Sequence, residues 1–239
     1  MKKIKIGTSG YNYQHWRGVF YPKDLPEKKW LEFYAKVFNT VELNVTFYRL
    51  PKMQVFEGWR ERVPKNFRYA VKGSRFITHI KKLKDCQDPV RIFYKNAKAL
   101  GEKLLVILWQ LPPNLKVDHE KLEKFVKFLP AGRHAFEFRE KSWFCKAVYD
   151  ILKKNRMSLV LADSPSWPYE EILTAAFVYI RMHGGRSLYG SKYSDKELKV
   201  WAEKIKKWGK DRDIFVYFNN DTHGYAVENA KKLRELLNV

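Results

Sequence analysis

Residues 213–221 read DIFVYFNND, an apolar run that ends abruptly in three polar side chains. The β-branched and aromatic residues of this run are typical of a buried β-strand. Residues 226–237, AVENAKKLRELL, follow closely and carry apolar residues at the spacing of an amphipathic helix. A buried strand that leads into a helix is the repeating unit of α/β folds, whose sites lie where the strands end. The polar residues at 219–221 are therefore expected to border a site.

The same alternation of a short β-rich run and a longer helical pattern extends over the whole chain. The predicted strands cover residues 3–9, 40–47, 67–73, 103–111, 134–139, 157–163, 177–183 and 213–220. Eight such units without a Pro-, Gly- or Ser-rich linker predict one domain over residues 1–239, a single (β/α)8 TIM-like barrel. A doubly wound open sheet is the alternative, because the sixth connection, residues 163–176, holds only about two helical turns.

The charge of the chain is strongly positive. Forty-seven Lys and Arg residues against 26 Asp and Glu give a net charge of +21. Such a surface attracts nucleic acid or other polyanions, and it is equally typical of a Lys-rich thermophilic protein. The excess is uneven, because residues 49–103 contain fifteen Lys or Arg and five Asp or Glu. This unevenness favours one basic face.

Cysteine content and hydropathy indicate the compartment. The two cysteines, Cys86 and Cys145, show no CxxC spacing and are too few for a zinc cluster, which favours free thiols in a reducing environment. The sequence contains no run of eighteen apolar residues and no charged segment followed by an apolar signal sequence. We expect a cytoplasmic protein with no membrane partner, and nothing in the sequence predicts a protein partner.

Polar residues recur at the ends of the predicted strands. In VELNVTFY, residues 41–48, the alternation places Glu42, Asn44 and Thr46 on one face, which should point into the barrel. Isolated buried charges are costly, so these residues should be paired or functional. The expected catalytic residues are Glu42, Glu137, Asp163 and His183. The expected substrate-binding residues are Asn44, Tyr48, Lys72, Gln110, Arg139, Trp143, Arg181, Gly184, Gly185, Arg186, Asn219, Asn220 and Asp221. The alternative is an internal salt-bridge network that plugs the top of the barrel.

The loops after the last two strands suggest a phosphate site. HGGRSLYG, residues 183–190, joins a glycine pair to Arg186, and Asp221 or Thr222 is placed as the N-cap of the last helix. Barrels often bind phosphate at these two loops through backbone N–H groups and a helix N-terminus. The alternative is that the glycines only shape turns. Aromatic residues in the same set of loops, Trp143 and Trp167 among them, could stack on a ligand or form a satellite core.

A metal site has weaker support. Glu42, Glu137, Asp163 and His183 could supply mixed nitrogen and oxygen ligands for a divalent metal. However, the sequence contains no HxH, HExxH or CxxC motif, and no nucleophile elbow for a Ser or Cys triad. No cofactor is expected on this basis, and a divalent metal stays an open alternative.

Several segments resemble the YecE-like family of domains of unknown function, number seventy-two in that series. The matching segments are IGTSGYNYQHWRGVFYP, VELNVTFYRLP, YAVKGSRFITH, LWQLPP, FEFREKSW, VYIRMHGG and VYFNND, which together span nearly the whole chain. Tyr11 stands where this family usually has Trp. The resemblance implies a TIM-barrel-like fold and supplies no activity, because the family has no established one.

The strand-end residues favour an enzyme that acts on a phosphorylated or nucleic-acid substrate, of the phosphodiester hydrolase type. Lys72, Arg139 and Arg181 would neutralise the phosphate, Glu42 or Glu137 would act as general base, and His183 would protonate the leaving oxygen. One alternative is a metal-free carbohydrate-active enzyme that uses Glu42 and Glu137 as a carboxylate pair. Another is a non-catalytic module that binds RNA or DNA.

Overall fold

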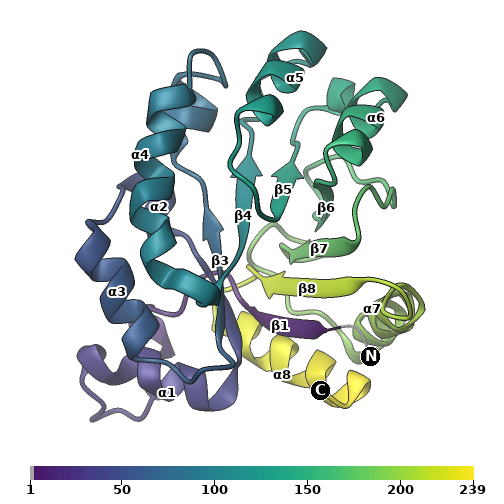
Figure 1. Ribbon diagram of the computed structural model, residues 1–239. Helices are drawn as coiled ribbons and strands as arrows, with labels where there is room; N and C mark the ends of the chain where they lie inside the picture. The colour runs from purple at the N-terminus through teal and green to yellow at the C-terminus, as the bar shows by residue number, and fades with distance from the viewer. Residues whose placement is uncertain (1–2) are drawn as a thin grey trace.

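The computed structural model describes residues 3–239, which form a ring of eight parallel strands surrounded by helices (Figure 1). The strands are Ile4–Thr8 (β1), Thr40–Leu43 (β2), Arg68–Lys72 (β3), Leu104–Gln110 (β4), His134–Glu137 (β5), Ser158–Asp163 (β6), Phe177–Met182 (β7) and Asp213–Phe218 (β8). Their spatial order, β1-β8-β7-β6-β5-β4-β3-β2, follows the order in the chain around the ring. This arrangement is the expected (β/α)8 TIM-like barrel, and the open-sheet alternative is wrong.

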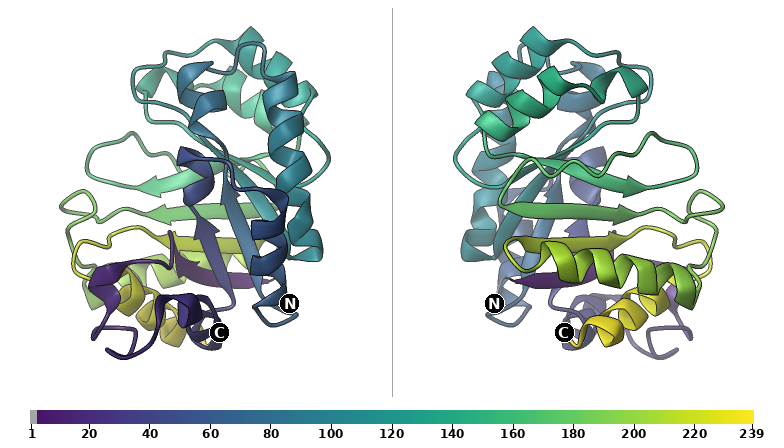
Figure 2. Two further views of the ribbon diagram at one scale, coloured as in Figure 1. Left: turned by 90° about the vertical axis from the view of Figure 1, so that its left-hand side faces the viewer. Right: turned by 90° about the vertical axis from the view of Figure 1, so that its right-hand side faces the viewer.

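Helices fill most of the connections on the outside of the strands. The α-helices are Trp30–Val37 (α1), Val45–Tyr48 (α2), Met53–Glu61 (α3), Gln87–Ala97 (α4), His119–Lys127 (α5), Lys146–Lys154 (α6), Asp195–Trp208 (α7) and Tyr225–Leu237 (α8). Shorter turns are Gln14–Trp16 (η1), Glu27–Lys29 (η2), Phe76–Ile80 (η3), Lys98–Lys103 (η4) and Lys141–Trp143 (η5). Figure 2 shows α7 and α8 against the outer side of β7, β8 and β1. Among residues 3–239, no helix is both long and apolar enough to cross a lipid bilayer.

Two layers of apolar residues hold the barrel together. The strands turn one set of side chains outward against the helices, where Trp30, Trp109 and Phe125 belong to a continuous core. They turn a second set inward, where Tyr179, Phe215 and other buried residues fill the interior. The interior is therefore packed with side chains rather than open, as in other barrels of this size. At the C-terminal ends of the strands, polar groups take over from the apolar ones.

The ring closes between β1 and β2 through a very close approach of the two backbones. The bridge pairs Ser9 with Glu42, and the Gly10 N–H donates to the Glu42 carbonyl at 2.8 Å. One pleat earlier, a Cβ atom on Gly7 would lie 2.2 Å from the Thr40 carbonyl oxygen. Only glycine, which lacks Cβ, allows this contact.

The structure corrects the predicted second strand. The strand ends at Leu43, and α2 begins at Val45, so the residues expected to continue the strand form a helical turn instead. The Thr46 hydroxyl donates to the carbonyls of Leu43 at 3.1 Å and Lys72 at 2.6 Å. A threonine hydroxyl that bonds nearby backbone can replace strand pairing in this way. The turn brings Phe47 and Tyr48 to the top of the barrel.

The sixth connection is also different from the expectation. Residues 164–176 contain no helix at all, whereas the sequence predicted about two helical turns. Pro165 and Pro168 lie in the first part of this segment, and each removes a backbone donor and restricts the residue before it. The segment therefore joins β6 to β7 as an extended loop, and this loop places Trp167 near the site.

We predict that Gly7→Ala destabilises the protein by at least about 3 kcal/mol, because the new methyl group must push β1 away from β2. Urea unfolding followed by circular dichroism measures the change. Gly58→Ala is the matched control: the residue lies in α3, a Cβ there would meet no atom within 4 Å, and we expect a gain of about 0.5–1 kcal/mol. Equal stabilities for the two variants would contradict this account of closure.

Candidate functional site

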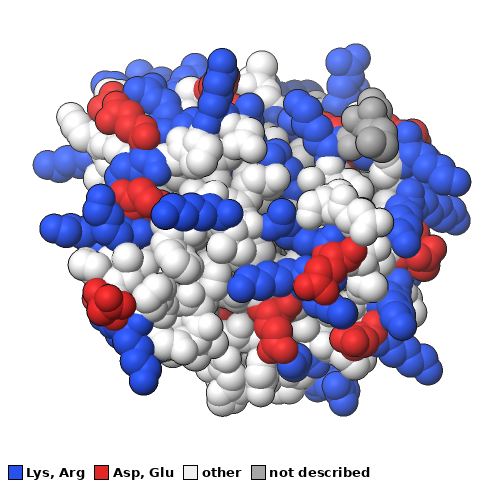
Figure 3. Space-filling model, turned by 90° about the horizontal axis from the view of Figure 1, so that it is seen from below, with Lys and Arg blue, Asp and Glu red and all other residues white. Residues whose placement is uncertain are grey.

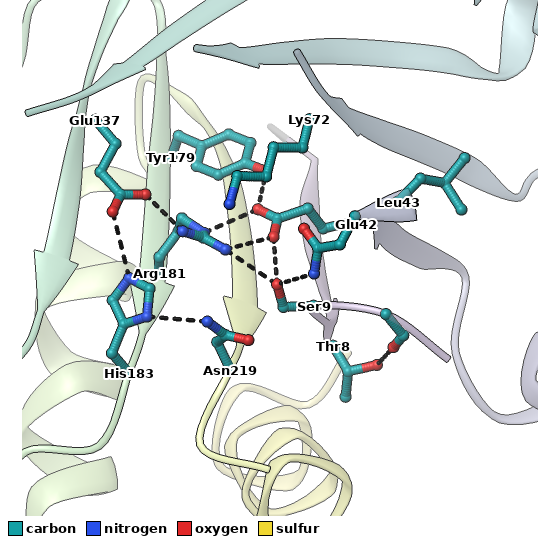
Figure 4. A network of polar contacts seen from close by, with 12 residues as sticks. Thr8, Ser9, Glu42, Leu43, Lys72, Glu137, Tyr179, Arg181, His183 and Asn219 are labelled. Atoms are coloured by element: carbon teal, nitrogen blue, oxygen red, sulfur yellow. Dashed lines mark hydrogen bonds and ion pairs between the residues drawn. The ribbon is translucent and has the colours of Figure 1, made fainter. Parts of the chain in front are cut away.

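A buried guanidinium lies at the centre of the polar residues. Arg181, on β7, is 1% exposed, and its side chain points into the barrel between two glutamates that are fully buried (Figure 4). Its Nη2 and Nε atoms donate to Glu42 at 2.7 and 3.0 Å, and its Nη1 donates to Glu137 at 2.6 Å. The same Nη2 atom lies 3.1 Å from the Ser9 hydroxyl. Arg181 therefore links β1, β2, β5 and β7.

Glu42 has all of its acceptor capacity in use. Besides Arg181, its carboxylate accepts hydrogen bonds from the Tyr179 hydroxyl at 2.7 Å and from the Ser9 hydroxyl. Ser9 in turn accepts from the Asn44 side chain at 2.8 Å. Four donors around one buried carboxylate satisfy it completely. Glu42 is consequently a structural anchor in this arrangement, and no oxygen is free to take a proton from a substrate.

Glu137 is held by two cations. Its Oε2 atom accepts from Arg181, and its Oε1 atom accepts from Arg139 Nε at 2.8 Å. Burial by itself raises the pKa of Glu137, but the charges of Arg181 and Arg139 outweigh it and hold the pKa well below the usual value. The guanidinium carbon of Arg139 lies 3.6 Å from the ring centre of Trp167, so the loop after β6 covers this ion pair.

His183 lies below the pocket rather than in it. The ring is fully buried, its Nδ1 atom lies 3.1 Å from the Asn219 amide nitrogen, and its Nε2 atom is 3.7 Å from Glu137 without a hydrogen-bond partner. Burial, aided by the charge of Arg181, moves the pKa of His183 well below its usual value. The imidazole is therefore neutral at physiological pH, which disfavours the predicted role of proton donor to a leaving group.

Above this network lies a pocket of about 1070 Å³ at the C-terminal ends of the strands. Eight of the predicted site residues line it: Asn44, Tyr48, Lys72, Gln110, Arg139, Arg181, Asn219 and Asp221. Arg181 forms part of the floor, which separates the two glutamates from the ligand space. The structure therefore contains both features that the sequence suggested. A salt-bridge network fills the top of the barrel, and a pocket lies above it.

Lys72, at the end of β3, differs from the other cations at the floor. Its ammonium lies 4.1 Å from the ring centre of Phe47, and within residues 3–239 it has no hydrogen bond or ion pair. Burial, together with the neighbouring charge of Arg181, lowers the pKa of Lys72 to about 7, although Glu137 and Glu42 act to raise it. About half of the Lys72 side chains are therefore neutral amines near pH 7.

The loop after β3 adds two more groups to the pocket. It forms the π-helical turn η3, a conformation that often marks functional sites. Arg75, at the start of this turn, and His79, within it, both line the pocket. The pKa of His79 falls to about 4 because of burial and the charge of Lys72, so its ring is neutral. Its Nδ1 atom lies 2.8 Å from the Thr78 hydroxyl.

Asp221 occupies the opposite wall. Its carboxylate accepts from the Trp16 indole at 2.8 Å and lies 2.9 Å from His15 Nε2. Burial raises the pKa of Asp221 to about 6, against the lowering effect of these two partners. The predicted capping role is wrong, because α8 begins at Tyr225 with Gly224 as its N-cap. Asp221 instead ties the first loop to the last one.

Asp163 does not join the other carboxylates. It pairs in register with Met182, and its neighbour Ala162 pairs with the inward-pointing Arg181. The Asp163 side chain therefore points outward, where it accepts a hydrogen bond from the Trp201 indole of α7 at 3.1 Å. The strand SLVLAD is apolar on both faces, so its sequence did not reveal which side faces inward.

Trp143 also lies outside the pocket. Its ring stacks on Phe138 with centroids 4.7 Å apart, and its indole donates to the Leu115 carbonyl at 2.6 Å. It is 1% exposed and belongs to the continuous outer core of the barrel rather than to a ligand site or a separate satellite core.

Gly184, Gly185 and Arg186 of the loop after β7 shape a turn and do not line the pocket, whereas Tyr189 of the same loop does. Gly184 adopts a φ of +98°, and its N–H donates to the Tyr193 hydroxyl at 3.0 Å. The N–H of Arg186 is bonded to the Ser191 hydroxyl, and its guanidinium extends into solvent 3.9 Å from Glu197. Gly185 faces Glu197 and Tyr193. These backbone donors are already used, so the predicted phosphate cradle of Gly184, Gly185 and Arg186 is not formed.

Asn220 stabilises the last loop from inside. Its amide donates to the Ser191 carbonyl at 3.0 Å and to the Asn229 side chain at 2.9 Å. Of the three polar residues that end β8, Asn219 and Asp221 line the pocket, and Asn220 holds the loop that carries them.

The predicted metal ligands do not form a metal site. Within residues 3–239, no group of three or more His, Cys, Asp and Glu side chains is placed to hold a metal ion. Asp163 points away, and the oxygens of Glu42 and Glu137 are engaged by arginines.

Several pocket residues were missed in the sequence. Arg49, Arg75 and His79 line the pocket, and Ser9 and Tyr179 complete the shell of Glu42. The available signal was the basic segment 49–103, which contains Arg49, Lys72 and Arg75. On the face shown in Figure 3, Lys and Arg are dispersed among acidic residues.

Arg181→Met is predicted to destabilise the protein by about 3–5 kcal/mol, because it leaves two buried carboxylates without their shared cation. Denaturant unfolding measures the loss. Arg91→Met is the control, since Arg91 is exposed and its pair with Asp88 at 3.0 Å should contribute less than about 1 kcal/mol. A loss below about 1 kcal/mol for Arg181→Met would exclude a central role for the network.

Lys72→Met is predicted to raise stability near neutral pH. The wild-type side chain loses its proton at about pH 7 when folded and at its ordinary value of 10.5 when unfolded, so folding is opposed below pH 7 and becomes easier as the pH rises to 10.5. At about 1.4 kcal/mol per pKa unit, the variant should gain a few kcal/mol at pH 6–7 and lose this advantage by pH 10. Thermal unfolding across this range tests the prediction, with the exposed Lys199→Met as control. A pH-independent difference would refute it.

Comparisons with known proteins give a consistent result. The UPF0759 protein YunF from Bacillus subtilis is 25% identical, covering 99% of this chain and 95% of that protein. The UPF0759 protein YecE from Escherichia coli K12 is 27% identical, covering 86% of this chain and 84% of that protein.

A solved structure and a family model extend this result. The crystal structure of a DUF72 family protein from Thermotoga maritima MSB8 superimposes with a TM-score of 0.90 at 30% identity, covering 99% of this chain and 100% of that chain. The model of the family described as "Protein of unknown function DUF72" matches residues 5–239. This chain belongs to the DUF72 family.

Proposed function

We propose that the protein is an enzyme that acts on a small phosphate-bearing substrate bound in the pocket above Arg181. The observation that carries this proposal is the charge of the lining. The pocket wall includes five cationic side chains, Arg49, Lys72, Arg75, Arg139 and Arg181, against one carboxylate, Asp221. A concave site with such an excess of positive charge favours an anionic ligand.

The excess persists after the ion pairs are subtracted. Arg139 and Arg181 are balanced by Glu137 and Glu42. The other three cations, Arg49, Lys72 and Arg75, have no ion-pair partner within residues 3–239. Two of them are exposed arginines, whose planar guanidinium groups match the geometry of phosphate oxygens.

The rest of the lining fits a small organic molecule. Tyr11, Tyr13, Tyr48 and Trp59 contribute aromatic surface beside the cations. The volume of about 1070 Å³ lies at the upper end of typical ligand pockets. A sugar phosphate or a nucleotide fits these dimensions. The dispersed charge on the face shown in Figure 3 gives less support to a module that binds long nucleic acid through that face.

The reaction must use groups that reach the pocket. A carboxylate pair of the glycosidase type is not supported, because Glu42 and Glu137 lie beneath the floor with every oxygen bound. For a hydrolase of the phosphodiester type, the lining groups that could accept a proton from water are His79 and Asp221. Lys72 offers an additional basic group in the same space.

Isothermal titration calorimetry with ribose 5-phosphate, and with ribose as the uncharged partner, tests the proposal. We expect the phosphate ester to bind and ribose not to, and Arg75→Ala to weaken binding about ten- to a hundredfold, which corresponds to a lost charged hydrogen bond of about 1.5–3 kcal/mol. Arg91→Ala removes an exposed arginine outside the pocket and should leave affinity unchanged. Equal binding of both sugars, or of both variants, would reject a phosphate site; a screen of phosphoesters would then define turnover.

A further inference from the structure

Lys72 is an unusual buried amine because no atom in the part of the chain that the structure describes accepts a hydrogen bond from it or pairs with its charge. The residue is 8% exposed, and within residues 3–239 its Nζ atom has no hydrogen-bond or ion-pair partner. Lys103 shows the ordinary solution to burying an amine: it is 7% exposed, and its Nζ atom donates to the carbonyls of Arg60 and Val63 at 2.6 Å each. Unlike Lys103, Lys72 directs its amine into a ligand pocket.

The surrounding charges explain why no counter-ion is available to Lys72. The two carboxylates of the network, Glu42 and Glu137, are both engaged by Arg181 (Figure 4), and Glu137 also accepts from Arg139. Two negative charges are thus matched by two guanidinium groups before the lysine is counted. A protonated Lys72 adds a surplus positive charge to the floor of the pocket.

The groups that face this amine from other elements act on its protonation state in opposite directions. Phe47 of α2 presents its ring face to the amine, a cation–π contact that favours the ammonium form, and the neutral His79 of η3 supplies no negative charge. Arg181 and Arg139 repel the proton, Glu137 and Glu42 attract it less strongly than burial and repulsion expel it, and the pKa of Lys72 is lowered to about 7. A lysine in this state is a nucleophile at neutral pH.

We propose that Lys72 captures the carbonyl carbon of a phosphorylated aldehyde or ketone as an imine. This inference rests on the proposed function and deepens it, because it names the substrate class as carbonyl compounds that carry a phosphate. Arg75 is only three residues further along the chain and lines the same pocket, so amine and phosphate anchor belong to one ligand space.

The chemistry balances without any further reactant. The Nζ lone pair forms a C–N bond as the carbonyl π electrons move to oxygen, and a proton shift gives a neutral carbinolamine. The hydroxyl then leaves as water after it takes up one proton from solvent, and the nitrogen lone pair forms the C=N bond. The products are an iminium ion and water. The iminium withdraws electrons from the adjacent carbon, which supports proton removal or carbon–carbon bond cleavage there.

Reductive trapping tests the inference. Glyceraldehyde 3-phosphate is added to the wild-type protein at pH 7 with sodium cyanoborohydride, and the adduct is located by intact mass and peptide mapping. We expect modification at Lys72 to be at least about a hundredfold faster than at surface lysines, whose neutral fraction at pH 7 is lower by about three powers of ten. Inorganic phosphate should slow the reaction at Lys72 alone.

Two lysines in the same chain serve as internal controls. Lys103 is equally buried but capped by carbonyls and should stay unmodified. Lys5 also has a lowered pKa, of about 8, but lies outside the pocket, so any adduct there should be insensitive to phosphate. The rate at Lys72 should level off above about pH 7, whereas surface lysines should react faster up to about pH 10.

Lys72→Arg should abolish the adduct, because the nucleophile is lost while the positive charge remains. If this variant does not fold, the pH profile and phosphate protection in the wild-type protein decide the question alone. Phosphate-ester binding without an adduct at Lys72 would overturn the imine and leave the proposed function standing. Adducts spread over surface lysines would do the same. An adduct that forms equally well from unphosphorylated glyceraldehyde would overturn the phosphorylated substrate class.

Discussion

The contact of Arg181 with Glu42 and Glu137 is the constraint on which the rest of the structure depends. Two carboxylates this deep in a barrel would repel each other and lose their hydration, and a single guanidinium placed between them compensates both. Because the three residues come from β2, β5 and β7, the network also fixes how these strands meet. Ser9 joins Glu42 to the strand pair that closes the ring.

This network separates the polar residues into two groups with different roles. Glu42, Glu137 and His183 lie in the sealed layer and have little freedom to react. Lys72, Arg75, His79 and Asp221 lie in the open layer above it. Because Arg181 and Arg139 are paired with both buried carboxylates, Lys72 is left without a counter-ion, and the pocket keeps a net positive charge. The unpaired lysine and the fully paired arginines thus have a common cause.

The fold and part of the site could be predicted from the sequence because the relevant signals are local. Alternation in VELNVTFY correctly indicated that Glu42 points inward, and this held because its neighbours on the other face are apolar. The prediction failed for Asp163. Both faces of that strand are apolar, so the alternation of residue types does not show which side chains point inward. It failed for the second strand because the hydrogen bond from Thr46 to the Lys72 carbonyl joins residues 26 positions apart.

The sequence by itself determined the strand count, the barrel class and the presence of polar side chains at the strand ends, because apolar periodicity and residue type are properties of neighbouring positions. Only the tertiary structure decided which of those side chains neutralise one another and which face a ligand. Pairing depends on distances of a few ångströms between strands that are far apart in the chain. The protonation state of Lys72 is the sharpest example, since it follows from burial and from four charged side chains at three other strand ends.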